Sequence, residues 1–289
     1  SRPSMAVLMQ AAGEEALILG PFAPPVVALL GVTGISYGSM LLYASIPIAL
    51  VTIVVTWVMA SRLQVQYAHE TFPHDETEER FVPTKRQNTA TVVFILAFIA
   101  CVAYGLIFKA KTSYVIFVML FLSILTGIVG GLRVGKVFHL LVEGMKKNFH
   151  LFFIFFLLGP MLDLVQKAGG FDALMKLFVP LEHFGGKIVL SILIGITGAF
   201  GMPAASAAVI KMLHEMFSPV ALEMNLSIIT FAFSMLLATR ITNFAIPGAN
   251  MFAAMGFAES QNVKAMIKNG LTVTAVQILF LVVYSVIWH

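Results

Sequence analysis

A short polar stretch near the C-terminus holds the side chains best suited to chemistry. Within an otherwise apolar segment, residues 238–250 combine hydroxyl, amide and guanidinium groups with a helix breaker: Thr239, Arg240, Thr242, Asn243, Pro247, Gly248 and Asn250. An arginine near the middle of a membrane costs at least about 2.5–3.5 kcal/mol, so Arg240 is expected to face a cavity or a partner. Its planar guanidinium could hold a carboxylate by two hydrogen bonds, whereas the Thr and Asn oxygens and the carbonyls released by Pro247 could coordinate Na⁺. The alternatives are that Arg240 reaches the membrane surface or pairs with Asp163.

A stretch of small residues, GAFGMPAAS, is the second candidate. Four of its residues predict a break between two helices: Gly198, Gly201, Pro203 and Ser206. Proline removes a backbone donor and interrupts the helical ladder. A helix that begins near Pro203 would present free N–H groups to an anion. The alternative is that these small residues only allow two helices to pack closely.

Residues 1–60 and 198–258 share a loose plan, which indicates an internal repeat. Each begins with proline and small residues, around Pro3 and Pro203. Each later has an apolar helix interrupted by hydroxyl and small residues, in GVTGISYGSM and in ATRITNFAIPGAN. Under this repeat, the first half supplies its own counterparts: Ser4 for the small-residue stretch around Pro203, and Ser36 and Ser39 for the polar stretch.

Acidic side chains within apolar segments are candidates for proton coupling. Asp163 could carry a proton, although a boundary residue paired with Lys167, four positions later, is the simpler interpretation. Four further titratable residues are interpreted as polar residues at helix ends or in loops: Glu14, Glu15, His214 and Glu215.

The composition is that of a membrane protein. Of the 289 residues, 59% are hydrophobic and only 11% are charged, and the mean hydropathy is +0.94. Soluble domains carry about 25% charged residues. A soluble fold of this length could not hide so much apolar surface, because much of its exterior must face water. We therefore expect an all-α, polytopic membrane protein.

Five apolar segments approach or reach the roughly 20 residues that a membrane span needs. They are Met40–Ala60, Thr89–Phe108, Ser113–Leu132, Phe149–Val165 and Leu271–Trp288. Arg133–Asn148 is expected to be an amphipathic helix in the membrane interface, and Phe171–Phe178 a shorter one. The charges and prolines between Arg62 and Gln87 indicate a solvated linker.

This organisation predicts three parts: the end of a first transmembrane repeat (residues 1–60), a linker (61–88) and a second transmembrane repeat (89–289). If Lys187–Phe217 is a re-entrant hairpin, ten Lys and Arg residues lie on the side of the linker and five on the opposite side. The positive-inside rule then places the linker in the cytoplasm. Since the chain begins with Ser1, we expect that its natural N-terminal part is missing.

Several function classes have no support in the sequence. The nucleotide-binding pattern GxxxxGK[ST] is absent, which argues against ATP-driven transport within this chain. HExxH and paired cysteines are absent, and the single Cys101 lies in an apolar run, so no enzyme, metal site or cofactor is predicted. The net charge of +4 is interpreted as loop charge rather than as a nucleic-acid-binding surface.

The succession of these motifs resembles the ion-transporter superfamily. The resemblance rests on the hairpin GAFGMPAASAAV, the interrupted helix ATRITNFAIPGANMFAAMGFAES, a short basic loop at Gln261–Asn269 and a terminal apolar helix. That superfamily includes gluconate and lactate permeases, divalent-anion/sodium symporters, sodium/proton antiporters and the large membrane subunit of tripartite periplasmic transporters. The resemblance implies two inverted repeats, each with a re-entrant hairpin and a broken helix around the substrate site, and by analogy a homodimer. Arg240 is not a general feature of the superfamily, and it favours an anion over pure cation exchange.

The leading hypothesis is a multi-pass secondary transporter of the inner (cytoplasmic) membrane that moves a small organic anion together with Na⁺ or H⁺. Arg240 and the N–H groups of the hairpin would bind the carboxylate. The runner-up is a sodium/proton antiporter of the same architecture, which needs a titrating carboxylate within the membrane and for which Asp163 is the candidate. The third hypothesis is a non-transporting membrane scaffold subunit, whose broken helices would bind no ligand.

Overall fold

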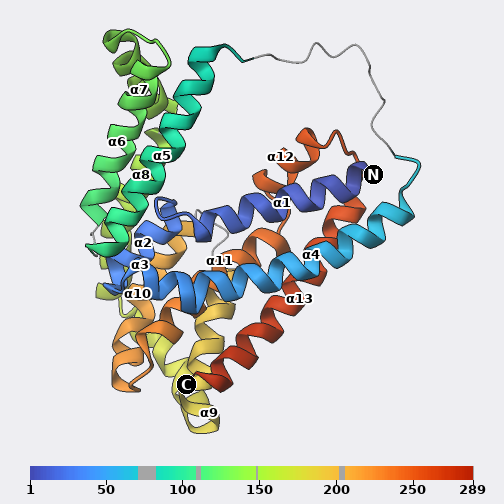
Figure 1. Ribbon diagram of the computed structural model, residues 1–289. Helices are drawn as coiled ribbons and strands as arrows, with labels where there is room; N and C mark the ends of the chain where they lie inside the picture. The colour runs from blue at the N-terminus through green and yellow to red at the C-terminus, as the bar shows by residue number, and fades with distance from the viewer. Residues whose placement is uncertain (71–82, 109–111, 148, 202–205, 289) are drawn as a thin grey trace. The chain divides into compact units, whose positions relative to one another are not determined.

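The computed structural model describes residues 1–70, 83–108, 112–147, 149–201 and 206–288, which form helices joined by turns, without a strand (Figure 1). The helices are α1 (Arg2–Leu19), α2 (Pro24–Thr33), α3 (Tyr37–Met40), the π-helical turn η1 (Leu41–Ser45), α4 (Ile46–Gln66), α5 (Lys85–Ile107), α6 (Thr112–Val129), α7 (Val134–Lys147), α8 (Phe149–Lys167), α9 (Gly170–Gly201), α10 (Ser206–Glu223), α11 (Ile228–Ala245), α12 (Ala249–Phe257) and α13 (Val263–Ile287).

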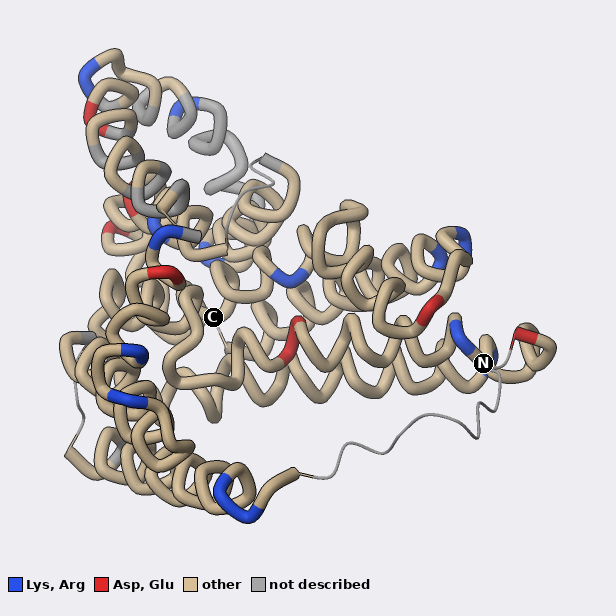
Figure 2. The backbone as a smooth tube through the Cα atoms, turned by 90° about the horizontal axis from the view of Figure 1, so that it is seen from above, with Lys and Arg blue, Asp and Glu red and all other residues tan. Residues whose placement is uncertain are grey.

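Five helical segments in the described ranges are long and apolar enough to cross a membrane. They are Arg2–Thr33, Tyr37–Gln66, Lys85–Gly105, Ile228–Ala245 and Val263–Ile287. Charged residues are sparse along the backbone (Figure 2). Apolar side chains such as Ile53, Trp57 and Leu96 are exposed on the helix surfaces, which lipid accommodates and water does not. The predicted all-α, polytopic membrane fold is confirmed.

The chain divides into two compact units, Ser1–Pro73 with Val165–His289, and His74–Leu164. In the second unit, α5 packs against α6 and α6 packs against α7. The Tyr114 hydroxyl at the start of α6 donates to the Cys101 carbonyl oxygen of α5 at 2.9 Å. The predicted amphipathic segment Arg133–Asn148 forms α7.

The core of the first unit is built where α1, α4, α12 and α13 meet. α1 lies beside α4 (Figure 1) and also packs against α12, whereas α11 packs against α9 and α13. Close approach depends on glycine: a Cβ at Gly270 of α13 would lie 2.2 Å from the Phe244 carbonyl oxygen of α11. One cluster joins these helices through small and flexible apolar side chains: Ala6, Val7, Ala60, Leu63, Met251, Met255, Ala258, Ala265 and Met266.

Both helix interruptions predicted from hydroxyl and small residues are present, but each is short. The chain leaves α2 through Gly34, whose φ of 70° suits glycine, and resumes helix at Tyr37. Near the C-terminus α11 continues to Ala245 and the break covers only residues 246–248, around Pro247. Residues 238–245 and 249–250 of the predicted interruption are therefore helical, because Pro247 ends α11 only near its own position and α11 is held by its packing against α9 and α13.

One sequence prediction holds and another needs correction. Phe171–Phe178 lies in the first part of α9, which the kink at Gly186 (φ 52°, ψ −129°) separates from the rest of that helix, so a short helix is present there. Glu14 and Glu15 are not at a helix end: they lie within α1 and are 0% and 2% exposed. The predicted break around Pro203 falls on residues 202–205, between the end of α9 and the start of α10, and these residues lie outside the described part of the chain.

Candidate functional site

The Glu14 carboxylate is the centre of the most polar cluster in the interior of the first unit. Its Oε2 accepts hydrogen bonds from Arg240 Nη1 and Asn243 Nδ2, each at 2.6 Å. Its Oε1 accepts from Asn250 Nδ2 at 2.5 Å. Both Glu14 and Arg240 have side chains that are 0% exposed, so this is a buried ion pair supplemented by two amides.

Every nitrogen of the Arg240 guanidinium is bonded. Nη1 also donates to the Glu14 carbonyl oxygen at 2.7 Å, Nη2 donates to Ser206 Oγ at 3.1 Å, and Nε donates to Thr239 Oγ1 at 3.2 Å. Arg240 therefore neither reaches the membrane surface nor depends on Asp163, because Glu14 neutralises its charge. A buried pair is stable only when its remaining donors and lone pairs are satisfied, and these bonds meet that condition.

Helical spacing and the short break explain why these side chains meet. Arg240 and Asn243 are three residues apart on α11 and so share a face. The break at residues 246–248 turns the chain, and Asn250 then projects from the first turn of α12. Gln10, one turn before Glu14 on α1, adds a link by donating to the Asn243 carbonyl oxygen at 3.4 Å.

A cavity of about 310 Å³ adjoins the Glu14 carboxylate. It is lined by Glu14 of α1 and by residues at and on both sides of the break between α11 and α12: Thr242, Asn243, Ile246, Pro247, Gly248, Ala249, Asn250 and Met251. This volume lies at the lower end of the range for small-molecule pockets. The two amide donors to Glu14, Asn243 and Asn250, also line the cavity, so a small anion in it would meet N–H groups already placed for a carboxylate.

The contact between α11 and α9 depends on Thr242 of α11 and Gly198 of α9. The Thr242 hydroxyl lies 2.8 Å from the Ala199 carbonyl oxygen and 3.0 Å from the Ala238 carbonyl oxygen. A Cβ at Gly198 would lie 2.5 Å from Leu213 and 2.8 Å from Ala238, so the absence of a side chain lets α9, α10 and α11 pack closely. Gly198 thus has the packing role that was the alternative for the small residues. Ser206, at the start of α10, contributes its hydroxyl to Arg240, and Gly201 is the last residue of α9.

The predicted first-half residues lie elsewhere in the first unit. Ser4 is buried near the start of α1, where its hydroxyl donates to the Ala60 carbonyl oxygen at 2.9 Å. Ser36 caps α3, and its Oγ lies 2.9 Å from Ser39 Oγ. None of the three has a hydrogen bond to the Glu14–Arg240 pair among the described contacts. Asp163 is exposed on α8, within the second unit.

Sequence reasoning missed Glu14 and Glu15 as functional candidates. Residues 5–19 are apolar except for Gln10, Gly13 and these two acids, so their charges had the same need for a partner as that of Arg240. Matching an isolated intramembrane acid to an isolated intramembrane base would have suggested the pair. The pair was not predicted because α1 and α11 are far apart in the sequence.

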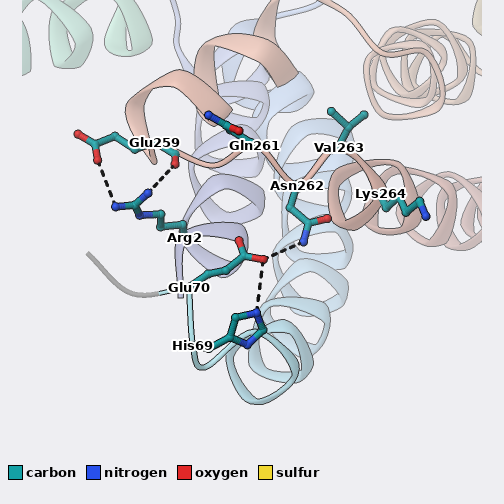
Figure 3. Close-up of a pocket in the computed structure, with 8 residues that line it drawn as sticks. All are labelled: Arg2, His69, Glu70, Glu259, Gln261, Asn262, Val263 and Lys264. Carbon is teal, nitrogen blue, oxygen red and sulfur yellow. Dashed lines mark hydrogen bonds and ion pairs between the residues drawn. The ribbon is translucent and has the colours of Figure 1, made fainter. Parts of the chain in front are cut away.

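A larger cavity of about 770 Å³ lies at the N-terminal end of α1 (Figure 3). Arg2 faces Glu259, at 3.7 Å between Nη2 and Oε2, and Glu70 accepts from Asn262 Nδ2 at 3.3 Å (Figure 3). Acidic and basic groups are mixed around it and the Glu259 side chain is 64% exposed, so ions there are screened by solvent. The buried Glu14 cluster is therefore the stronger candidate site.

Comparison with known proteins gives one family. The model of the DctM component of the tripartite ATP-independent periplasmic transporter matches residues 1–288. No curated protein and no solved structure matches the chain.

Proposed function

Because that match covers nearly the whole sequence, the chain belongs to the DctM family, and we propose that it moves a small organic carboxylate across the cytoplasmic membrane by coupling to Na⁺ or H⁺. The family is the large membrane component of secondary transporters for organic anions, and it works with DctP and DctQ components. The carboxylate, the coupling ion and the residues that bind them are the parts of the proposal that go beyond the family.

The observation that carries the proposal is the set of donors around Glu14. Arg240, Asn243 and Asn250 hold the carboxylate of this chain at 2.5–2.6 Å beside a cavity. Glu14 thus stands in for the carboxylate of a transported anion, with the charge and geometry that such a group would need. The anion would enter the cavity and take over one or more of these donors when α1 moves away from α11 and α12.

Oxygen atoms next to this cavity are suited to the coupling ion. Where α11 meets α9, the Thr242 hydroxyl lies 3.4 Å from the Gly198 carbonyl oxygen and 2.8 Å from the Ala199 carbonyl oxygen. The broken helix around Pro247 and Gly248 frees further carbonyl groups. Such discontinuous helices are where secondary transporters bind substrate and coupling ions. Movement of the region that contains α9 and α10 would expose the site to each side in turn.

The sodium/proton antiporter is a second candidate that one observation favours. The sequence offered only Asp163 as its titrating carboxylate, whereas the structure buries Glu14 and Glu15 within α1. Membrane antiport needs such acids facing a cavity or a partner. The Arg240 charge opposes pure cation exchange, and the DctM family supports the anion, so the carboxylate transporter remains the leading function.

Uptake into proteoliposomes tests the proposal. The full reading frame, reconstituted with its DctP and DctQ components, would be offered radiolabelled lactate, succinate or citrate under imposed Na⁺ or pH gradients. Gradient-driven uptake that Asn243→Ala abolishes supports the proposal, and Asn262→Ala is the matched control, since Asn262 caps α13 outside the cluster. Na⁺-for-H⁺ exchange without carboxylate uptake would instead establish the antiporter. Activity of the assembly that is unchanged by Arg240→Ala and Asn243→Ala would establish the scaffold.

A further inference from the structure

Glu15 is a second buried carboxyl group in α1, and it has no role in the carboxylate site. It is 2% exposed within α1, and neither Oε1 nor Oε2 has a hydrogen bond of ordinary geometry to any described residue. An ionised carboxylate buried without donors loses its hydration and gains nothing in return. In practice such a group takes up a proton instead of remaining charged.

The positive charge nearest to Glu15 is already neutralised. Arg240 lies close enough to act on Glu15, but its guanidinium is bonded to Glu14 Oε2 at 2.6 Å and to three other oxygens. Glu14 and Arg240 together carry no net charge. An ionised Glu15 would therefore add a net negative charge to the interior, next to a second carboxylate.

The side of Glu15 that faces α4 and α13 offers acceptors rather than donors. The Thr52 hydroxyl of α4 lies against Glu15, and it is 3.0 Å from the Ile48 carbonyl oxygen, to which it donates. The same Thr52 oxygen accepts from Gln277 Nε2 of α13 at 2.9 Å. A protonated Glu15 could donate to the Thr52 oxygen, whereas an ionised Glu15 would face the lone pairs of that oxygen.

Other charged groups on α4 and α13, which pack against α1, lie several turns away from Thr52 and Gln277 along the helix axes. Arg62 is ten residues beyond Thr52 on α4, and Lys268 is nine residues before Gln277 on α13, which at 1.5 Å per residue places them roughly 14–15 Å away. Lys264 lies one turn further still. The Tyr284 hydroxyl of α13 donates to the Tyr43 carbonyl oxygen. Arg240 and Glu14 are thus the described charges that act on Glu15.

From this geometry we propose that Glu15 is a proton-binding site of the transport cycle: it carries a proton in the state described here and gives it up to water when the neighbouring carboxylate site opens. On release, the O–H bond of Glu15 breaks, water takes the proton, and the negative charge stays on Glu15. The inference deepens the proposed function and rests on it, since it identifies the group through which H⁺ would couple to anion movement. Glu15 and Glu14 are adjacent in sequence, so any shift of α1 that exposes one carboxyl group moves the other.

Infrared spectroscopy of the purified full-length protein tests the proton without any transported solute. Wild-type protein at neutral pH should show the carbonyl stretch of a protonated carboxylic acid, shifted in D₂O, and Glu15→Gln should remove it. Glu259→Gln is the matched control, because Glu259 is an exposed acid outside the cluster, and it should keep the band. Absence of the band in wild type, or its persistence in Glu15→Gln, would overturn the proposal. Failure of Glu15→Gln to fold would also count against it, since Gln has the shape of the neutral acid.

Uptake measurements then test the coupling. In proteoliposomes that contain the DctP and DctQ components, a pH difference of one unit should raise succinate accumulation by up to about tenfold per coupled proton, and Glu15→Gln should remove this stimulation while Glu259→Gln keeps it. Stimulation that is unchanged in Glu15→Gln would overturn the coupling. If no carboxylate is taken up at all, the proposed function fails, and the infrared result still decides whether Glu15 binds a proton.

Discussion

Glu14 and Glu15 are adjacent on α1 and almost equally buried, yet they lie in opposite surroundings. Glu14 faces α11 and α12 and receives hydrogen bonds from Arg240, Asn243 and Asn250. Glu15 faces α4, where Thr52 has already donated its proton to Ile48. One face of α1 thus surrounds a carboxylate with donors, and the other leaves a carboxyl group without any.

The comparison shows two ways in which a membrane interior accepts an acid. On the α11 face a positive charge and two amides balance the carboxylate, and the pair remains ionised at the expense of fixing four side chains. On the α4 face, the negative charge of Glu15 has to be neutralised by a proton. The first arrangement suits recognition of an anion, and the second suits binding and release of H⁺.

Arg240→Met is expected to have the largest effect on this comparison. It leaves the Glu14 charge buried without a cation, which should lower the free energy of unfolding by about 3–5 kcal/mol. Denaturant unfolding in detergent micelles measures the change. In the double variant Glu14→Gln/Arg240→Met much of the loss should return, and strict additivity of the two single effects would show that the pair is not coupled.

Asn243→Ala should have the next largest effect. It removes a half-buried donor to the ionised Glu14, and hydrogen bonds to charged groups contribute about 1.5–3 kcal/mol. The same unfolding measurement applies, and uptake should also fall. A change within experimental error would indicate that Glu14 does not depend on this amide.

Asn250→Ala should cost less, about 0.5–1.5 kcal/mol, because Asn250 is exposed in the first turn of α12 and water can replace its amide. Its effect on uptake should exceed its effect on stability, since it lines the cavity. Uptake at the wild-type rate, with the apparent affinity for the anion unchanged, would exclude it from the binding site.

Glu15→Gln should have the smallest effect on stability, under about 1 kcal/mol, because an amide replaces a neutral acid of the same shape. Glu14→Gln is the matched comparison and should cost several times more, since it leaves Arg240 unpaired. Thermal unfolding of the two variants side by side checks this. Equal losses would show that Glu15 is ionised as Glu14 is.

The membrane fold and the position of the broken helix could be predicted from local sequence. Long apolar runs require helices in lipid, where backbone groups must bond within the segment, and Pro247 can only interrupt such a helix. The need of Arg240 for a partner also followed from its apolar neighbours. The extent of the break could not be predicted, because the turns before Pro247 stay helical through contacts of α11 with α9 and α13.

By itself, then, the sequence determined that the chain crosses a membrane, that a helix breaks near Pro247, and that Arg240 needs a cavity or a partner. Only the tertiary structure decided which acid supplies that charge. Glu14 is 226 residues away from Arg240, and Glu15, with the same chemistry and nearly the same burial, points elsewhere. The physical reason is helical geometry, because one residue along a helix turns a side chain by about 100°. The packing of α1 between α4, α11 and α12 therefore determines which carboxyl group meets a cation and which meets a hydroxyl.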